Sequence, residues 1–317
     1  MIAAISCNIS IQSQTAWTNV DSLFSPLPKS MHLWFTNDSL EGKPNVAYYV
    51  KIALHDRCII FGADTALNRG LTPSQYYARN ADPLLVVNCS FFSKQRRNLN
   101  IVVDEGKMVS FNLPSVFSSS DSLYHYVTRS AIGIDRHRNA DVAWIYTDTV
   151  RKKATAFSEE PVVSEGDNYY LKLKQLLADG NIPQKAACHT WKVETAVGGG
   201  PNLVSGGEIN ITNEEERMFT GKAINDRHPR TAMGYTSDGF LVIMVIEGRN
   251  PGRAEGATLM QEALMLKELG CVEALNLDGG GSSCMLINGK QTIIPCDKTG
   301  QRPVPAVFMI RSAKMRY

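Results

Sequence analysis

Short apolar runs separated by turn residues fill most of the chain after residue 46. Each run is rich in β-branched or aromatic residues and is broken by Asp, Gly or Asn, which is typical of strands. The runs have the sequences VAYYVKIAL, RCIIFGA, LLVVNCSFF and NIVVDEGKMVSFN. This pattern predicts a domain in which strands dominate.

Three segments carry helical signals instead. In LTPSQYYARN, Pro73 stands at the first helical position. In NYYLKLKQLLADG, apolar residues recur at helical spacing and Gly180 ends the pattern. In GATLMQEALMLKELGC, Thr258 and Gln261 form a capping-box pair, and Gly270 closes a body of good helix formers. This last helix leads into the strand CVEALNLD.

One stretch of the chain resembles another. TRSAIGIDRHRNADVAWIYTD and PRTAMGYTSDGFLVIMVIEGR each run from an arginine through Ala and Gly to a polar turn and a second strand. The likeness predicts two equivalent hairpins in one curved sheet, with Arg129 and Arg230 aimed at one cavity. Two independent hairpins that share common residues are the alternative.

These elements predict an α+β fold: one large, curved, mostly antiparallel sheet with helices packed against it. A single domain is expected over residues 46–317. The segment 1–45 is rich in Ser, Asn and Pro, which indicates an extension or a lead-in strand. The order AISC before Asn8 resembles a bacterial lipobox, so Cys7 would carry lipid if the true start lay upstream. An unremarkable N-terminal cysteine is the alternative.

Composition narrows the class of partner. The 317 residues include 33 Lys plus Arg and 31 Asp plus Glu, a net charge of +2, so no nucleic acid is expected as partner. No apolar run is long enough to span a membrane. The seven cysteines form no CxxC pair, and core thiols are favoured over disulfides for Cys89 and Cys271.

Asp278 is the first candidate for chemistry. It ends an apolar strand and precedes three glycines and two serines: Gly279, Gly280, Gly281, Ser282 and Ser283. Bare glycines let a ligand approach backbone N–H groups, and the serines add hydroxyl donors. A tight turn is the alternative, although a two-residue turn does not need three glycines.

Two further loops carry charge. NDRHPRTAMG holds His228 and Arg230, which suit a phosphate, although solvated surface arginines are the usual alternative. IEGRNPGRAEG places Glu247 at the end of a buried strand, followed by Arg249. Such a carboxylate can serve catalysis, or it can simply be solvated or paired with Arg249. Asn88 follows another strand and suits either a ligand or a turn.

Other catalytic patterns are absent from the sequence. The six histidines are scattered and indicate no metal site. There is no G-x-S-x-G elbow, no Walker A lysine and no Rossmann unit around the glycines. No cofactor is expected, and a divalent cation near Asp278 has no ligand cluster to support it.

Four segments in a fixed order resemble the phosphodiester glycosidase family, which includes the mannose 6-phosphate uncovering enzyme and many bacterial proteins. The segments are VVNCSFF, VGGGPNLVSGGEI, HPRTAMGYTSDG and VIEGRNPGRAEGATLMQEALMLKELGCVEALNLDGGGSSCMLING. The resemblance covers residues 48–310. The chain departs from the family at Glu247, where Asp is common, and at Cys89 and Ser90, where glycines are usual.

The resemblance implies hydrolysis of a sugar-1-phosphodiester, with release of the sugar and a phosphate monoester. Asp278 and Glu247 are then the expected catalytic pair, because a glycosidase needs carboxylates at the anomeric carbon. Arg129, Arg230 and Arg249 would neutralise the phosphate. The alternative is a non-catalytic cell-envelope module that binds phosphorylated or anionic glycans. A periplasmic or cell-surface location is expected for either.

Overall fold

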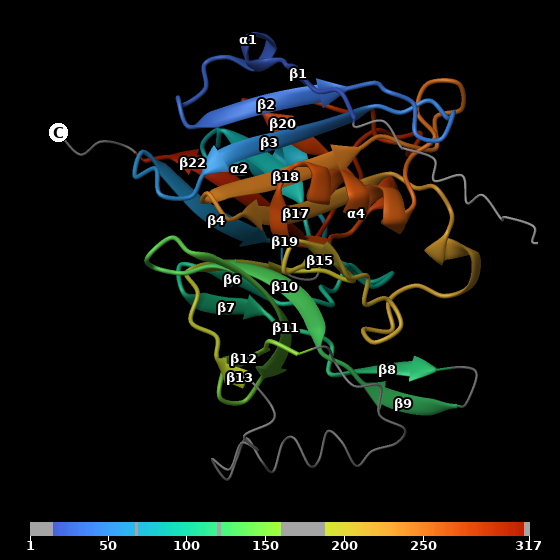
Figure 1. Cartoon of the computed structure of the whole chain (residues 1–317). Coiled ribbons are helices and arrows are strands. Elements are labelled where there is room, and N and C mark those ends of the chain that lie inside the picture. The colour runs from blue at the N-terminus through green and yellow to red at the C-terminus, as the bar shows by residue number, and fades with distance from the viewer. Residues whose placement is uncertain (1–14, 67–68, 119–121, 160–187, 314–317) are drawn as a thin grey trace, which may run out of the picture.

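The computed structural model describes residues 15–66, 69–118, 122–159 and 188–313. Its strands form three larger sheets and one hairpin, and every pairing between these strands is antiparallel. Figure 1 shows the eight-stranded sheet above the seven-stranded one. The predicted helix ending at Gly180 lies outside the described residues.

The eight-stranded sheet contains the second predicted hairpin. Its order is β1 (Thr18–Asn19), β2 (Met31–Thr36), β3 (Ala47–Ala53), β18 (Phe240–Ile246), β17 (Arg230–Thr236), β19 (Cys271–Asn276), β15 (Asn202–Ser205) and β16 (Glu208–Ile209). The central β18 is buried on both faces, which explains its continuous apolar sequence. β2 pairs with β3 along its whole length, and Met31 and Leu33 belong to the core. β2, which lies in the segment expected as an extension or a lead-in strand, is therefore part of this sheet.

The seven-stranded sheet contains the first predicted hairpin. Its order is β13 (Cys188–Thr190), β12 (Lys153–Phe157), β11 (Ala140–Asp148), β10 (Arg129–Ile134), β14 (Thr195–Gly198), β6 (Val102–Asp104) and β7 (Lys107–Ser110). Both hairpins form as expected, but the prediction that they share one sheet is wrong. β10 continues its sheet through β14 and β17 continues its sheet through β19, so each hairpin has its own set of neighbours.

The glycine loop after Asp278 leads directly into the third sheet. Its order is β21 (Lys290–Gln291), β20 (Met285–Ile287), β5 (Leu85–Asn88), β22 (Ala306–Ser312) and β4 (Ile59–Thr65). A separate hairpin joins β8 (Ser115–Ser118) to β9 (Leu123–Tyr126) and projects from the body in Figure 1. The main apolar core draws residues from all three larger sheets.

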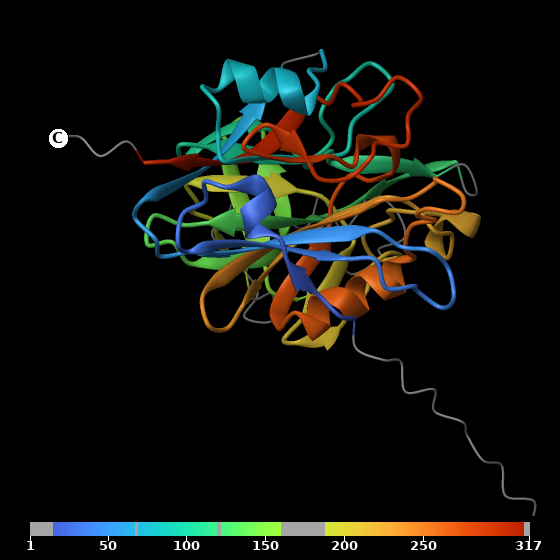
Figure 2. The same cartoon turned by 90° about the horizontal axis from the view of Figure 1, so that it is seen from above.

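Few helices occur among the described residues. They are α1 (Asp21–Phe24), α2 (Pro73–Arg79), α4 (Leu259–Glu268) and the 3-10 turns Gly221–Ile224 and Gly280–Ser282. The predicted capping box forms at α4, and a capping box also forms at α2, where the sequence predicted a helix start at Pro73. Figure 2 shows these two helices on opposite sides of the molecule. The strand content confirms the expected antiparallel architecture, but several sheets with few helices replace the single sheet.

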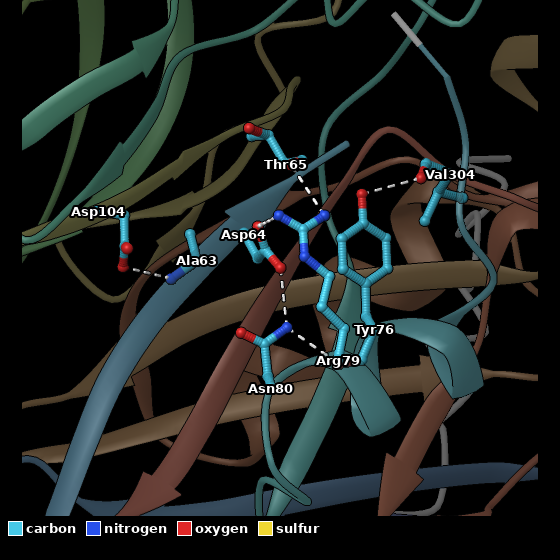
Figure 3. Close-up of polar contacts among 8 residues, drawn as sticks. All are labelled: Ala63, Asp64, Thr65, Tyr76, Arg79, Asn80, Asp104 and Val304. Carbon is cyan, nitrogen blue, oxygen red and sulfur yellow. Dashed lines mark hydrogen bonds and ion pairs between the residues drawn. The ribbon is translucent and has the colours of Figure 1, made fainter. Parts of the chain in front are cut away.

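Polar contacts bind α2 to the five-stranded sheet (Figure 3). The Tyr76 hydroxyl donates to the Val304 carbonyl at 3.2 Å. Asp64 on β4 accepts a hydrogen bond from Asn80 at 2.8 Å and pairs with Arg79 at 3.3 Å. Because α2 packs on β5, these contacts also hold the end of β5, where Asn88 lies.

Glu216 joins the seven-stranded sheet to the eight-stranded sheet. Its carboxylate is fully buried and accepts hydrogen bonds from the Ser130 N–H at 2.7 Å and the Trp144 indole at 3.1 Å, both from the seven-stranded sheet. On the other side it accepts from the Asn202 N–H at 2.8 Å and the Thr212 hydroxyl at 2.6 Å. A buried charge is tolerated only when it is well hydrogen-bonded, so this carboxylate fixes how the two sheets meet.

Candidate active site

The backbone of Asp278 is held where the ends of three strands meet. Its N–H donates to the Cys89 carbonyl at 2.7 Å, just beyond β5. Its carbonyl accepts from the Asn88 side-chain amide. The preceding Leu277 N–H donates to the Thr231 carbonyl of β17 at 2.7 Å. Asp278 directly follows β19, and its position therefore depends on hydrogen bonds to residues of both β5 and β17 or just beyond them.

Asn88 and Ser283 belong to the support of this junction. Asn88 is fully buried, and its Oδ1 accepts from the Cys284 N–H at 3.0 Å. The Thr231 hydroxyl lies 3.0 Å from Asn88 Oδ1 and 3.2 Å from Ser283 Oγ. Both Oδ1 and Nδ2 of Asn88 make hydrogen bonds within the protein, so this residue supports the position of Asp278.

The three glycines allow other parts of the protein to approach the loop closely. A Cβ on Gly279 would lie 2.7 Å from the Pro229 carbonyl oxygen, which accepts a hydrogen bond from Gly280 N–H at 2.8 Å. A Cβ on Gly281 would lie 2.0 Å from a guanidinium nitrogen of Arg302. The Gly280 N–H is therefore not available to a ligand, contrary to expectation. The glycines are required chiefly because neighbouring groups occupy the space of a side chain.

The carboxyl group of Asp278 is the least satisfied part of the loop. Its Oδ2 is buried and has no hydrogen-bond partner among the described residues, and the same holds for the Ser282 hydroxyl oxygen. Burial raises the pKa of Asp278 to about 7, while Ser282, the charge of Arg302 and the Gly279 N–H act to lower it. Buried polar atoms are almost always paired, so these two oxygens mark a place for a ligand or water.

Arg302 is a site residue that the sequence did not reveal. Its guanidinium forms a two-bond pair with Asp297, at 2.7 and 2.8 Å, and lies against Gly281. Its positive charge acts to lower the pKa of Asp278, although Arg302 lies well after the glycine loop in the sequence. The segment CDKTGQRPVP has no recognisable motif. The only signal in the sequence is that Asp297 and Arg302 have opposite charges and lie five residues apart.

Arg249 and His228 form a second basic group at the loop. Arg249 has a positive φ of 60°, and its Nη2 lies 3.2 Å from His228 Nδ1. A Cβ on Gly280 would lie 3.2 Å from Arg249 Nη1, so the exposed guanidinium extends over this glycine. Burial lowers the pKa of His228, and the charges of Arg230 and Arg249 lower it further, against Asp226. His228 is therefore neutral at neutral pH, and Arg249 carries the positive charge.

The two hairpin arginines lie in different sheets, and each contacts the loop at residues 217–219. Arg129 Nη2 donates to the Arg217 carbonyl at 3.3 Å. The Arg230 guanidinium lies over the ring of Phe219, 5.9 Å from its centre, and its Nε donates to the Ala257 carbonyl at 3.0 Å. Burial lowers the pKa of both arginines. Both side chains have donors engaged with backbone carbonyls, so Arg249 is the more accessible cation.

Glu247 differs from the expected second catalytic acid. The carboxylate is fully buried, and its Oε1 accepts from Arg253 at 2.7 Å and from Asn250 at 3.0 Å. Its Oε2 accepts from the Ile294 N–H at 3.0 Å. The alternative for Glu247, a pairing with Arg249, does not form either, since Arg249 Nη2 lies 3.2 Å from His228 Nδ1. The surroundings of Glu247 support a positioning role and not an acid available for catalysis.

Glu262 lies on α4 beneath Arg230. It is fully buried, and neither carboxylate oxygen has a hydrogen-bond partner among the described residues. Burial raises the pKa of Glu262 to about 8, and the charge of Arg230 only partly opposes this rise. A protonated glutamic acid is therefore the main form of Glu262 in the folded protein at neutral pH.

This buried acid makes stability depend on pH. Folded Glu262 holds its proton up to about pH 8, whereas an unfolded glutamate releases it near pH 4.3. Its stabilising contribution is complete below the unfolded pKa and is lost as pH rises to 8. We expect Glu262→Gln, which cannot titrate, to gain on the order of 4 kcal/mol over the parent between pH 5 and 8.

Urea unfolding of both proteins at pH 5 and pH 8 measures this difference. Glu268→Gln in the same helix is the matched control, because Glu268 is exposed and should follow the parent at both pH values. Identical pH dependence in Glu262→Gln and the parent would contradict the assignment.

Within the described residues, no group of three or more His, Cys, Asp and Glu side chains could hold a metal ion. The six described cysteines are all unpaired, and Cys89 and Cys271 are buried, as expected for core thiols. Burial raises the pKa of Cys89 to about 12. No described helix has the length and apolar character needed to span a bilayer.

Solved structures share this fold at low sequence identity. The catalytic domain of zebrafish N-acetylglucosamine-1-phosphodiester alpha-N-acetylglucosaminidase, auto-inhibited by its pro-peptide, aligns with a TM-score of 0.59 and 16% identity over 95% of this chain and 89% of that one. A hypothetical protein from Synechocystis aligns at 0.58 and 16% identity, over 90% and 62%. A Burkholderia pseudomallei protein whose name describes it as exported aligns at 0.58 and 17%, over 87% and 75%.

Sequence relatives match shorter stretches. The SPbeta prophage-derived protein YomE of Bacillus subtilis (strain 168) is 42% identical over 74 residues, 23% of this chain and 11% of YomE. The N-acetylglucosamine-1-phosphodiester alpha-N-acetylglucosaminidase of Mus musculus is 33% identical over 103 residues, 30% of this chain and 20% of the mouse protein. The matched stretches thus span a fifth or less of these two relatives. The phosphodiester glycosidase family model matches residues 84–311, most of the chain, so this protein belongs to the phosphodiester glycosidase family.

Proposed function

We propose that the protein hydrolyses the glycosidic bond of a sugar-1-phosphodiester and leaves a phosphate monoester. The observation that carries this proposal is the Asp278 carboxyl group, which has a pKa of about 7 and a buried oxygen without a hydrogen-bond partner among the described residues. A base with a pKa near the working pH combines the right protonation state with good proton affinity. Membership of the phosphodiester glycosidase family supports the same reaction class.

In this reaction the bond between the anomeric carbon and the phosphate oxygen breaks, and its electron pair leaves with the phosphate. Water supplies the new hydroxyl group at the anomeric carbon and transfers its proton to the Asp278 carboxylate. The departing phosphate needs countercharge more than it needs a proton, because it is a good leaving group. Arg249, exposed over Gly280, supplies that charge, and Arg302 holds Asp278 ionised in part of the population.

Glu247 acts in this scheme by fixing the loop that carries Arg249. Its bonds to Asn250 and Arg253 fasten the turn immediately after Arg249. Arg230 and Arg129 brace the adjoining loop at residues 217–219. These three residues are positioning residues, and Asp278 is the single carboxylate that we assign to the reacting atoms.

The occupied carboxylate of Glu247 also favours a second candidate, a non-catalytic module that binds phosphorylated or anionic glycans. Such a module would use Arg249 and the glycine loop without turnover. For either function we propose a periplasmic or cell-surface location, which is supported by the name of the Burkholderia neighbour. The cysteine that could carry lipid, Cys7, lies outside the described residues.

Product analysis in ¹⁸O-labelled water tests the proposal. The purified protein is incubated with a panel of sugar-1-phosphodiesters, and both products are examined by mass spectrometry. We expect ¹⁸O in the released sugar, because water attacks the anomeric carbon. Label in the phosphate would show P–O cleavage and overturn the proposed bond. Binding without any product would favour the non-catalytic module.

A further inference from the structure

The seven-stranded sheet holds a groove that the proposed reaction does not use. Its volume is about 520 Å³, within the range of small-molecule sites. The β6–β7 end and the β12–β13 end of the sheet both contribute to its lining, as do the β10–β11 turn and the segment 190–194. The sheet curls between its two edge strands, β7 and β13. Both strands therefore lie on the same side of the molecule in Figure 1. None of the lining residues belongs to the Asp278 loop or to its supports.

The rim of this groove is basic. Lys152, Lys153, Lys192 and Arg136 line it and are exposed, together with His137. The lysine ion pairs of the described residues involve other lysines, at positions 43, 51 and 267. The three groove lysines are therefore not neutralised by a neighbouring carboxylate within the part of the chain that the structure describes.

Two carboxylates line the groove and reduce its charge only in part. Asp135 accepts hydrogen bonds from the N–H groups of His137 and Asn139, both at 2.8 Å, so its charge is directed into the hairpin turn. Glu194 is exposed beside Gly106. The groove is thus lined by four permanent positive charges and two negative charges, and this excess of positive charge favours an anionic ligand.

The floor of the groove is partly apolar. Trp191 is almost fully buried, and its indole N–H donates to Asp141 at 2.6 Å, so the ring is fixed in position. Val103, Met108 and Val193 also line the floor. An apolar floor with a basic rim suits a ligand that has both an apolar face and an anionic group. A sugar ring that bears a phosphate has both, whereas a free inorganic anion would use only the rim.

We propose that this groove is a second binding site for a phosphate-bearing glycan, separate from the site at Asp278. The choice of a glycan rests on the proposed function, since a substrate with repeated sugar phosphates could occupy both sites at once. The lysines supply point charges to the phosphate, and the floor packs against the sugar. Exposed charges are screened by salt, so the affinity falls as ionic strength rises.

Lysine footprinting tests the groove without any need for turnover. The full-length protein is acetylated at neutral pH, alone or with glucose 1-phosphate, and the rate at each lysine is read by mass spectrometry. At about three times the Kd, three quarters of the sites are filled, so acetylation of Lys152, Lys153 and Lys192 should slow about fourfold. The exposed lysines Lys29 and Lys94 should show no change.

Two ligand controls separate a glycan site from a simple anion site. Glucose alone should give no protection, and inorganic phosphate should protect only at about tenfold higher concentration, because the sugar contacts are missing. Equal protection by phosphate and glucose 1-phosphate at one concentration would overturn the assignment to a glycan. Protection of Lys29 and Lys94 to the same degree would overturn the site itself.

Matched variants complete the test. Lys153→Glu with Lys192→Glu should weaken binding of glucose 1-phosphate at the groove about tenfold or more, since two attractive charges become repulsive. Lys29→Glu with Lys94→Glu changes the net charge equally and should leave the groove footprint unchanged. Equal weakening in both double variants would overturn the proposal.

The outcome is independent of the catalytic assignment. Asp278→Asn should retain the groove footprint. In the parent protein, protection without hydrolysis would count against the proposed function and not against this site. Hydrolysis without protection would count against this site and not against the proposed function.

Discussion

Asp278→Asn is expected to lower kcat by about 10²–10⁴-fold, the range typical of a lost general acid or base. The substitution preserves the shape of the side chain and every backbone hydrogen bond of the loop, including Asp278 N–H to the Cys89 carbonyl. What it removes is a group able to accept a proton beside the anomeric carbon. Steady-state kinetics on the sugar-1-phosphodiester found by product analysis gives kcat and KM separately. Near-normal kcat in the variant would contradict the assignment.

The pH dependence distinguishes a chemical role from a structural one. Because burial raises the pKa of Asp278 to about 7, kcat/KM of the parent should rise with pH through 7 and then level off. The residual activity of Asp278→Asn should lack this rise. Asp82→Asn is the matched control, since Asp82 is exposed and distant along the chain, and it should keep the parent profile.

The same substitution should stabilise the fold at alkaline pH. The folded pKa lies above the unfolded value near 3.9, so the contribution of Asp278 to stability is lost as pH rises from about 4 through 7. Asparagine has no such loss, and Asp278→Asn should melt at a higher temperature than the parent at pH 8. An active site that destabilises the fold is a frequent consequence of function.

Glu216→Gln is expected to lower the free energy of unfolding by about 3–5 kcal/mol, as for a disrupted buried charge network. The donors around Glu216 come from Ser130, Trp144, Asn202 and Thr212. A glutamine offers one acceptor oxygen and an NH₂ group, so at least one backbone N–H would face another donor. Urea unfolding at neutral pH measures the loss.

The comparison for this variant is Glu214→Gln. Glu214 lies two residues earlier in the same acidic run and is exposed, so its substitution should change the free energy of unfolding by less than about 0.5 kcal/mol. Equal losses in the two variants would show that Glu216 does not hold the sheets together. A loss in Glu216→Gln alone would confirm its bridging role.

Local sequence predicted individual elements well because their signals are local. The capping boxes at Thr72 and Thr258 need only a hydroxyl and an amide three residues apart, and both form. The two hairpins also form where their turns and apolar runs predicted them. How strands join into sheets depends on partners far along the chain, such as β14 for β10, and the prediction that both hairpins share one sheet was wrong.

The candidate site shows the same division. Asp278 could be selected because a strand-end acid before three glycines is unusual, and its buried oxygen supports that choice. Glu247 had an equally good position in the sequence, yet Ile294 and Arg253 occupy its oxygens. Arg302 could not be selected, because only the folded chain brings it and its partner Asp297 against Gly281.

The sequence by itself determined which segments become strands and helices, which loop carries the acid, and the likeness to one family. Only the tertiary structure decided which charged groups are engaged and which are left unsatisfied. The acidic run at Glu214 to Glu216 resembles a solvated loop, but its last member is buried between two sheets with all its bonds made. Asp278 Oδ2 is also buried and has no partner in the described protein. The difference arises because the burial and the hydrogen bonding of a carboxylate depend on residues that are distant from it in sequence.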